Sequence, residues 1–232
     1  MIEPKYHPGE EILLDYADGS LSEPTALVVA THLALCPWCR RQVAELEAIG
    51  GALLEDEAPE PLSPNCLIEM MARLDDGSGS GEIRPGADRL PTPRPEPAPA
   101  PADLIRIPQP LRSYLDAPLE RLDWRPVMRG IEEVDLGLGR APVRTRLLRL
   151  RPGAAVPRHG HSGLEINLVL AGGYHDQRGR YRFGDVVVDD DSVDHRPVAD
   201  RGGDCVCLSV TDAPLRMTGG LRRILNIPLF RR

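Results

Sequence analysis

The amino-terminal fold is decided by the stretch His32-Leu33-Ala34-Leu35-Cys36-Pro37-Trp38-Cys39. It joins a His-x3-Cys step to a Cys-x2-Cys step and so offers three ligands to one metal ion. If residues 30–35 continue as a helix, His32 and Cys36 lie on one face and Cys39 returns on the next turn. The other His or Cys before residue 60 is His7. These four residues predict a closed, structural zinc site.

The same side chains have a simpler interpretation. Free cysteines are often buried for packing alone, and a helical histidine can be an ordinary core residue. We favour the metal site because this spacing of ligand types is uncommon by chance.

Residues 76–104 divide the chain into two parts. This segment is rich in Gly and Ser at first and in Pro and Ala later, and it lacks the apolar periodicity that builds a core. A chain of 232 residues is long enough for two modest domains, each burying its own core. We predict an amino-terminal domain over residues 1–75, called the head below, a flexible linker over 76–104, and a carboxyl-terminal domain over 105–232.

Charge is divided between the two ends of the chain. The head holds 4 Lys and Arg against 14 Asp and Glu, whereas residues 140–232 hold 16 against 10. A phosphate backbone would repel the acidic head, which argues against direct binding of DNA or RNA. The charge suits a basic protein partner instead.

Several features predict a cytoplasmic protein without membrane contact. The chain has no run of about 20 apolar residues, and its start, MIEPKYHPGEE, lacks the basic-then-apolar pattern of a signal peptide. Its 5 cysteines lie at irregular positions, which does not describe a secreted disulfide framework.

Four helices are predicted in the head. The first has its apolar stripe over residues 12–17, the second runs from Ser22 to the metal cluster, the third covers residues 39–54, and the fourth begins at Ser63-Pro64. The fourth carries more apolar surface than a helix before a disordered linker can use. It either grips another protein or folds back on the other helices. A core this small is marginal, so zinc would contribute much of its stability.

Beyond the linker, short strands replace helices. Alternating or β-branched apolar runs predict strands over residues 143–150, 164–171, 185–188 and 205–211, with Gly and Asp turns between them. Many short strands are typical of a sandwich or barrel.

A second set of metal ligands lies among these strands. His159 and His161 are two residues apart, so both imidazoles face one side of an extended segment, and Glu165 enters the same cavity on the next strand. His195 arrives from a distant strand. Three imidazoles and a carboxylate suit a divalent transition metal, with Zn, Fe, Mn, Ni and Cu all compatible. The alternative is a barrel that keeps its shape without an ion.

Two further cysteines, Cys205 and Cys207, face the same side of a predicted strand. They could be oxidised, act as alternative metal ligands near His195, or merely fill the barrel. The sequence leaves these roles open.

These motifs carry two family resemblances. The first motif of the cupins is matched by Gly153-x5-His159-x-His161-x3-Glu165-x6-Gly172. The second is matched in Gly184 and His195 but lacks the Pro-x-Gly that usually precedes the histidine. Combined with the His7 and His32-x3-Cys36-x2-Cys39 pattern, the order of parts resembles the ChrR-type anti-sigma factors over nearly the whole chain apart from the linker.

The resemblance implies a fold and a function. The fold would be a small zinc-bound four-helix domain, a Pro-rich linker and a cupin β-barrel of jelly-roll type. The function would be the binding of a group IV (extracytoplasmic-function, ECF) sigma factor, which keeps that subunit from core RNA polymerase. In the family the amino-terminal domain suffices for inhibition, and the cupin is needed for release in response to singlet oxygen and related oxidants. The second ligand set would then be the sensory metal site, with Cys205 and Cys207 as candidates for a part in sensing.

An enzyme is the alternative class of function. A cupin metal with open coordination could serve a dioxygenase or isomerase, with the head as a regulatory or dimerising appendage. The predicted barrel shows no added acid–base set beyond the ligands, so we predict a non-enzymatic regulator. A zinc-stabilised DNA-binding protein is a weaker third interpretation because the head is acidic.

Overall fold

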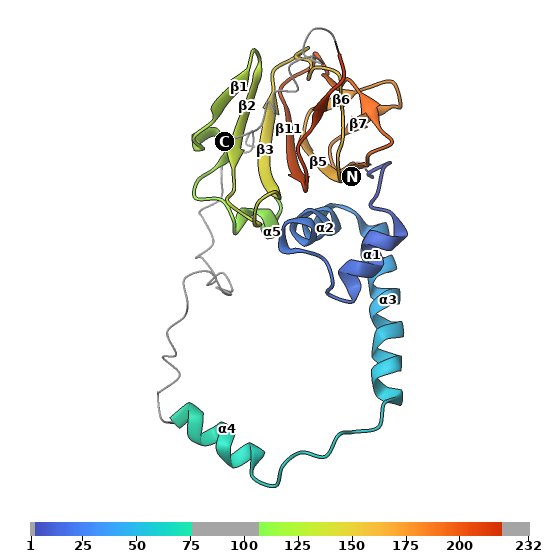
Figure 1. The fold of residues 1–232 in the computed structure, drawn as a ribbon, viewed down its shortest axis with the longest axis vertical. Helices are drawn as coiled ribbons and strands as arrows, with labels where there is room; N and C mark the ends of the chain where they lie inside the picture. The colour runs from blue at the N-terminus through green and yellow to red at the C-terminus, as the bar shows by residue number, and fades with distance from the viewer. Residues whose placement is uncertain (1–2, 76–106, 220–232) are drawn as a thin grey trace.

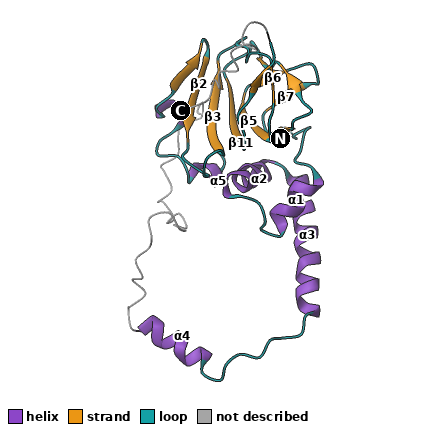
Figure 2. Ribbon diagram, in the orientation of Figure 1, coloured by secondary structure: helices purple, strands orange, loops and turns teal. Residues whose placement is uncertain are grey.

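The computed structural model describes residues 3–75 and 107–219, so the predicted linker lies outside the described residues. Helices form the amino-terminal part and strands most of the rest (Figure 2). The helices are α1 (Glu10–Ala17), α2 (Glu23–Leu35), α3 (Pro37–Asp56), α4 (Cys66–Asp75) and α5 (Gln109–Arg112), with a 3-10 turn at Leu119–Arg121. The strands are β1 (Arg125–Met128), β2 (Ile131–Asp135), β3 (Arg144–Leu150), β4 (His159–Gly160), β5 (Glu165–Ala171), β6 (Gly173–His175), β7 (Arg180–Arg182), β8 (Val186–Asp189), β9 (Asp194–His195), β10 (Val198–Ala199), β11 (Cys205–Thr211) and β12 (Arg216–Met217).

The head has a helix at each of the four predicted places, but only three of them pack together. α1, α2 and α3 enclose a small cluster around Leu13, Val29 and Val43. α4 stands apart from them at the end of an extended segment (Figure 1), with Leu67 and Ile68 exposed. The alternative in which the fourth helix folds back on the others is therefore not what the structure shows. Among the described residues, no helix combines the length and apolar character needed to cross a bilayer.

The carboxyl-terminal part is built on a six-stranded antiparallel sheet in the order β1-β2-β3-β11-β5-β8. Two three-stranded sheets, β10-β6-β7 and β12-β4-β9, accompany it. An apolar cluster that includes Val169, Tyr174 and Ala199 fills the space between the large sheet and the β10-β6-β7 sheet. The predicted strands are all present within about two residues, and they form the expected barrel-like array.

The register of the large sheet places polar side chains at one end of its inner face. Glu165 on β5 pairs with Asp189 on β8 and with Thr211 on β11. Two residues further along β5, Asn167 pairs with Ser209, which also pairs with Arg146 on β3. Because side chains alternate across a strand, these rows share the face that lines the barrel.

The outer face of the large sheet is covered by α2 (Figure 1). Leu27 and Val28 belong to the same buried cluster as Leu147, Ile166 and Leu208 on the strands. The prediction that each domain buries its own core is therefore wrong for this helix. The physical reason is that its sequence, EPTALVVATHLAL, is apolar on nearly all sides, and such a helix must be buried on more than one face.

The segment before the first strand extends this shared core. Leu111 on α5, Leu115 and Leu119 are buried in the same cluster as Leu27. The Tyr114 hydroxyl donates a hydrogen bond of 3.1 Å to Glu23 at the start of α2. Residues that precede the linker and residues that follow it thus pack together against the same face of the large sheet.

Truncating Leu27 should test whether α2 is part of the core beneath the large sheet. We expect Leu27→Ala to lower the free energy of unfolding by about 2–5 kcal/mol, because it empties a buried site between α2 and the sheet. Chemical denaturation followed by circular dichroism measures this. Leu54→Ala, at an exposed position on α3, is the matched control and should change stability by less than about 0.5 kcal/mol. Equal effects of the two substitutions would contradict the shared core.

Candidate metal sites

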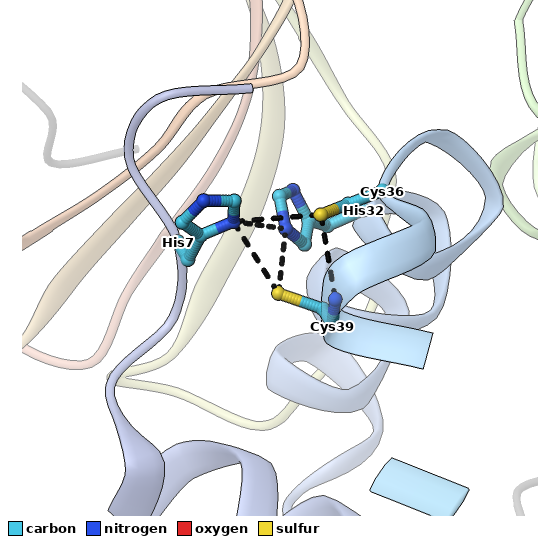
Figure 3. Close-up of side chains that lie close together, drawn as sticks. All are labelled: His7, His32, Cys36 and Cys39. Atoms are coloured by element: carbon cyan, nitrogen blue, oxygen red, sulfur yellow. Dashed lines mark hydrogen bonds between the residues drawn. The ribbon is translucent and has the colours of Figure 1, made fainter. Parts of the chain in front are cut away.

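The four predicted ligands of the head converge where α2 meets α3 (Figure 3). Cys36 joins the two helices with an extended backbone, so His32 in the last turn of α2 and Cys39 in the first turn of α3 face each other. Their Nε2 and Sγ atoms are 3.2 Å apart. His7, which precedes α1, brings its Nδ1 to 3.5 Å from the Cys36 Sγ, 3.4 Å from the Cys39 Sγ and 3.4 Å from the His32 Nε2.

These separations fit a tetrahedral ion. Bonds of about 2.0 Å to nitrogen and about 2.3 Å to sulfur place the four ligand atoms about 3.3–3.8 Å from one another. Here the ligand atoms all lie within 4.8 Å, and the closest pairs lie at 3.2–3.5 Å. The set of two imidazoles and two thiols is one that zinc prefers.

Electrostatics favour a cation at this point. Burial lowers the pKa of His32 to about 4, so the ring is neutral and can act as a ligand. Its Nδ1 lies 2.8 Å from the Gly184 carbonyl. Since a carbonyl only accepts, Nδ1 carries the proton and Nε2 offers its lone pair to the site. Burial and the neighbouring Cys36 raise the pKa of Cys39 to about 12. The Cys39 thiolate would be stabilised by a positive charge such as a divalent metal.

The second predicted set is also brought together, inside the barrel. His159 lies on β4 with His161 just after it, Glu165 begins β5, and His195 ends β9. The Nε2 atom of His195 is 3.0 Å from that of His159 and 3.3 Å from that of His161. Glu165 Oε2 lies 3.6 Å from His161 Nδ1. All four side chains are buried.

Hydrogen bonds behind the rings orient two of these imidazoles. His159 Nδ1 donates to the Pro157 carbonyl at 2.8 Å, and His195 Nδ1 donates to Asp176 at 2.9 Å. The lone pairs of the two Nε2 atoms therefore face each other. A cation bound between them would remove the repulsion of these lone pairs. Burial raises the pKa of Glu165 and, with the neighbouring imidazoles, lowers that of His161 to about 3. A neutral His161 ring can donate a lone pair to a metal, and a nearby cation would favour the ionised form of Glu165. This combination suits a divalent metal.

A cavity of about 50 Å³ adjoins this second set. Three of the ligands, His159, Glu165 and His195, line it, and most of its other walls are apolar. The remaining polar lining comes from Arg146, Asn167, Tyr174 and Cys207. Arg146, Asn167 and Tyr174 are not among the site residues predicted from the sequence. Asn167 could have been found because it lies two residues after Glu165 on the same strand face.

Cys205 and Cys207 share one face of β11, as predicted, and their sulfur atoms are 3.7 Å apart. Both thiols are free and buried. The hydrogen bond with Cys205, together with burial, raises the pKa of Cys207 well above its usual value. Burial and the raised pKa both disfavour the Cys207 thiolate, which is the reactive form of the side chain.

Comparison with known proteins identifies the family. A family described as "ChrR Cupin-like domain" matches residues 117–213, and one described as "Putative zinc-finger" matches residues 10–40. The anti-sigma-E factor ChrR of Cereibacter sphaeroides is 41% identical over 228 residues, which cover 98% of this chain and 98% of the relative. The chain belongs to the ChrR family of anti-sigma factors.

A solved structure agrees with this ChrR-family assignment. The crystal structure of Rhodobacter sphaeroides SigE in complex with the anti-sigma ChrR matches with a TM-score of 0.69 and 38% sequence identity. The match covers 90% of this chain and 99% of that chain. The helical head and the cupin-like barrel thus occur together in the family in the order predicted from the motifs.

Thiol labelling should separate the cysteines by burial. We expect Cys66, which is partly exposed on α4, to be alkylated in the native protein, whereas Cys205 and Cys207 react at rates that follow unfolding. Peptide mapping by mass spectrometry with increasing denaturant gives the three rates. Labelling of Cys205 or Cys207 as fast as Cys66 in the native protein would contradict the burial of the pair.

Proposed function

We propose that this chain is an anti-sigma factor that binds an ECF sigma factor in the cytoplasm and keeps it from core RNA polymerase. The observation that carries this proposal is the match over 98% of both chains to a protein named anti-sigma-E factor ChrR. The chain is then a regulator and not an enzyme. The cavity beside the cupin ligands is small. It does not favour a dioxygenase or isomerase over the function that the match supports.

The head site would hold zinc through His7, His32, Cys36 and Cys39. Four protein ligands close the coordination shell, so the ion would act by fixing the junction of α2 and α3 rather than by chemistry on a substrate. Because α1, α2 and α3 enclose only a small cluster of their own, the ion would supply part of the head's stability.

The barrel site would hold zinc or another divalent transition metal through His159, His161, Glu165 and His195. Such an ion would supply a Lewis-acidic centre inside the cupin. The hydrogen bonds from His159 to Pro157 and from His195 to Asp176 would orient its ligands. In line with the family resemblance, we assign to this domain the sensing of oxidative stress such as singlet oxygen.

The docking surface for the sigma factor would lie on the outer half of α3 and on α4. Ile49, Leu53 and Leu54 on α3 are 60–74% exposed, and Leu67, Ile68, Met70 and Met71 on α4 are 50–68% exposed. Apolar faces of this kind bind complementary grooves, and methionine adapts to their shape. The acidic head would add attraction to a basic, DNA-binding partner. We keep residues 1–75, 76–104 and 105–232 as the proposed domain boundaries.

Removing a head ligand should abolish capture of the sigma factor. We expect the wild-type chain to contain about two metal ions and to copurify with a sigma factor encoded beside it. Cys36→Ser should contain about one ion and lose the sigma factor, because the α2–α3 junction loosens. Metal analysis and coexpression pull-down measure both effects.

His161→Ala is the matched control for this experiment. It removes a ligand of the barrel site and should also leave about one ion, but it should keep the captured sigma factor because the head is intact. Undiminished capture by Cys36→Ser, or failure of the wild-type chain to copurify with the sigma factor, would contradict the proposal.

Substitutions on α4 test the docking surface. Leu67 and Met71 lie four residues apart on one helix face, and both are at least half exposed. Replacing both by Ser should weaken sigma-factor binding by at least about 10-fold with little change in stability, because they lose contacts only in the complex. Leu62→Ser, at an exposed position before α4, is the control and should bind as the wild type does. If deletion of residues 60–75 left the affinity unchanged, the role of α4 would be rejected.

A further inference from the structure

We infer that Asp185, in the turn between β7 and β8 of the cupin, is a positioning residue for the metal site of the head. This inference rests on the proposed binding of metal by the head. It assigns to the cupin a direct part in holding the two histidine ligands of that site.

The backbone that leads into His7 is held by the cupin, while the centroid of the His7 ring lies 4.9 Å from that of Trp38 on α3. His7 lies in residues 4–7, an irregular segment before α1 that we call the strap. The Asp185 Oδ1 atom accepts hydrogen bonds from the backbone N–H groups of Lys5 at 2.7 Å and Tyr6 at 3.1 Å. The backbone N–H of Val186 in turn donates to the Tyr6 carbonyl at 3.0 Å. The strap is thus tied to the start of β8 immediately before the ligand.

Side chains and backbone shape reinforce this attachment. The Tyr6 ring meets the Tyr181 ring edge to face, with centroids 4.8 Å apart. Gly184 has a positive φ of 88°, and a Cβ atom at this position would come within 2.9 Å of the Pro4 side chain. Glycine is therefore required for the close approach of strap and turn.

The other histidine ligand depends on the same turn. His32 Nδ1 donates to the Gly184 carbonyl at 2.8 Å, which sets the direction in which Nε2 faces the metal site. The turn itself is firmly held, because Gly184 N–H donates to the Val169 carbonyl and the Asp185 Oδ2 atom accepts from Arg182 N–H, both at 2.8 Å. The cupin therefore binds the backbone beside His7 and the ring of His32, which α2 carries, whereas both cysteines are positioned by the junction of α2 and α3.

This arrangement makes the retention of the head metal depend on the cupin. Outer hydrogen bonds that orient metal ligands are worth about 10–100-fold in metal affinity. Asp185 is buried, and its side chain accepts two hydrogen bonds from backbone N–H groups of the strap. The hydrogen bond from Val186 N–H to the Tyr6 carbonyl adds to them. Its loss should free His7 to leave the ion, without removing any ligand.

Cobalt substitution in the full-length chain tests the inference. A Co²⁺ ion bound by Cys36 and Cys39 gives thiolate-to-metal charge-transfer absorption, whereas the four barrel ligands include no thiolate. The rate at which a chelator abolishes this band therefore reports on the head site alone. We expect Asp185→Ala to release Co²⁺ about 10–100-fold faster than the wild type. Asp185→Asn, which keeps one acceptor oxygen, should lie in between.

Asp200→Ala is the matched control. This carboxylate also belongs to the cupin and pairs with His175 and Arg180 rather than with residues of the strap. Its removal should leave the release rate within about twofold of the wild type, since none of the hydrogen bonds that tie the strap or His32 to the turn involves it. Equal acceleration by Asp200→Ala and Asp185→Ala would overturn the inference, because general loosening of the cupin would then explain both.

Two further results would contradict the role of Asp185 or the head metal site itself. If Asp185→Ala does not fold, Tyr6→Ala replaces it, because Tyr6 lies in the strap and not in the barrel, and it too should speed release. Release from the Asp185 variants, or from Tyr6→Ala in that case, at the wild-type rate would overturn the inference and leave the proposed head site standing. Absence of the charge-transfer band in the wild-type chain would reject the head site itself, and the inference with it.

Discussion

Burial of α2 on more than one side is the constraint on which the rest of this structure depends. Val29 of this helix packs among α1 and α3, while Leu27 and Val28 pack against the outer face of the six-stranded sheet. One helix therefore supplies apolar surface to two cores, and the packing orients the head relative to the barrel. The outer half of α3 and α4 lie apart from the barrel (Figure 1). Leu53 and Leu54 on α3 and Leu67 on α4 are among the exposed apolar side chains there.

The two ligand sets share one chemical plan. In each, a backbone carbonyl or a carboxylate accepts a hydrogen bond from the far nitrogen of an imidazole, so the near nitrogen is free to bind a cation. In the head, burial lowers the pKa of His32 and raises that of Cys39; in the barrel, burial lowers the pKa of His161 and raises that of Glu165. A nearby divalent ion would favour the charged forms of Cys39 and Glu165. Strand β8 borders both sets. The turn that precedes it contacts His32 through Gly184, while Asp189 at the end of the strand pairs with Arg178, which is 3.4 Å from His195.

Local patterns predicted most of the elements and all eight side chains that the structure brings together as candidate ligands. The spacing of the head ligands and the i, i+2 step of the barrel histidines are local patterns, so they could be recognised without a structure. In the head the convergence differs from a single helical face, because the chain turns at Cys36 and places His32 and Cys39 on two helices. Arg146 and Tyr174 could not be assigned to the barrel cavity in this way, because their place depends on which strands become neighbours. The helix α5 was also missed, because four residues beside a proline carry too little periodic signal.

The sequence by itself determined the order of helices and strands, the two ligand sets, the acidity of the head and the family resemblance, since each depends on residues close together in the chain or on composition. Only the tertiary structure decided that α2 belongs to both cores, that α4 stands apart, and that a turn of the cupin positions two histidines of the head. Those facts depend on contacts between residues as far apart as His32 and Gly184. Such contacts are selected by the packing of whole surfaces, for which a linear sequence carries no short-range signal.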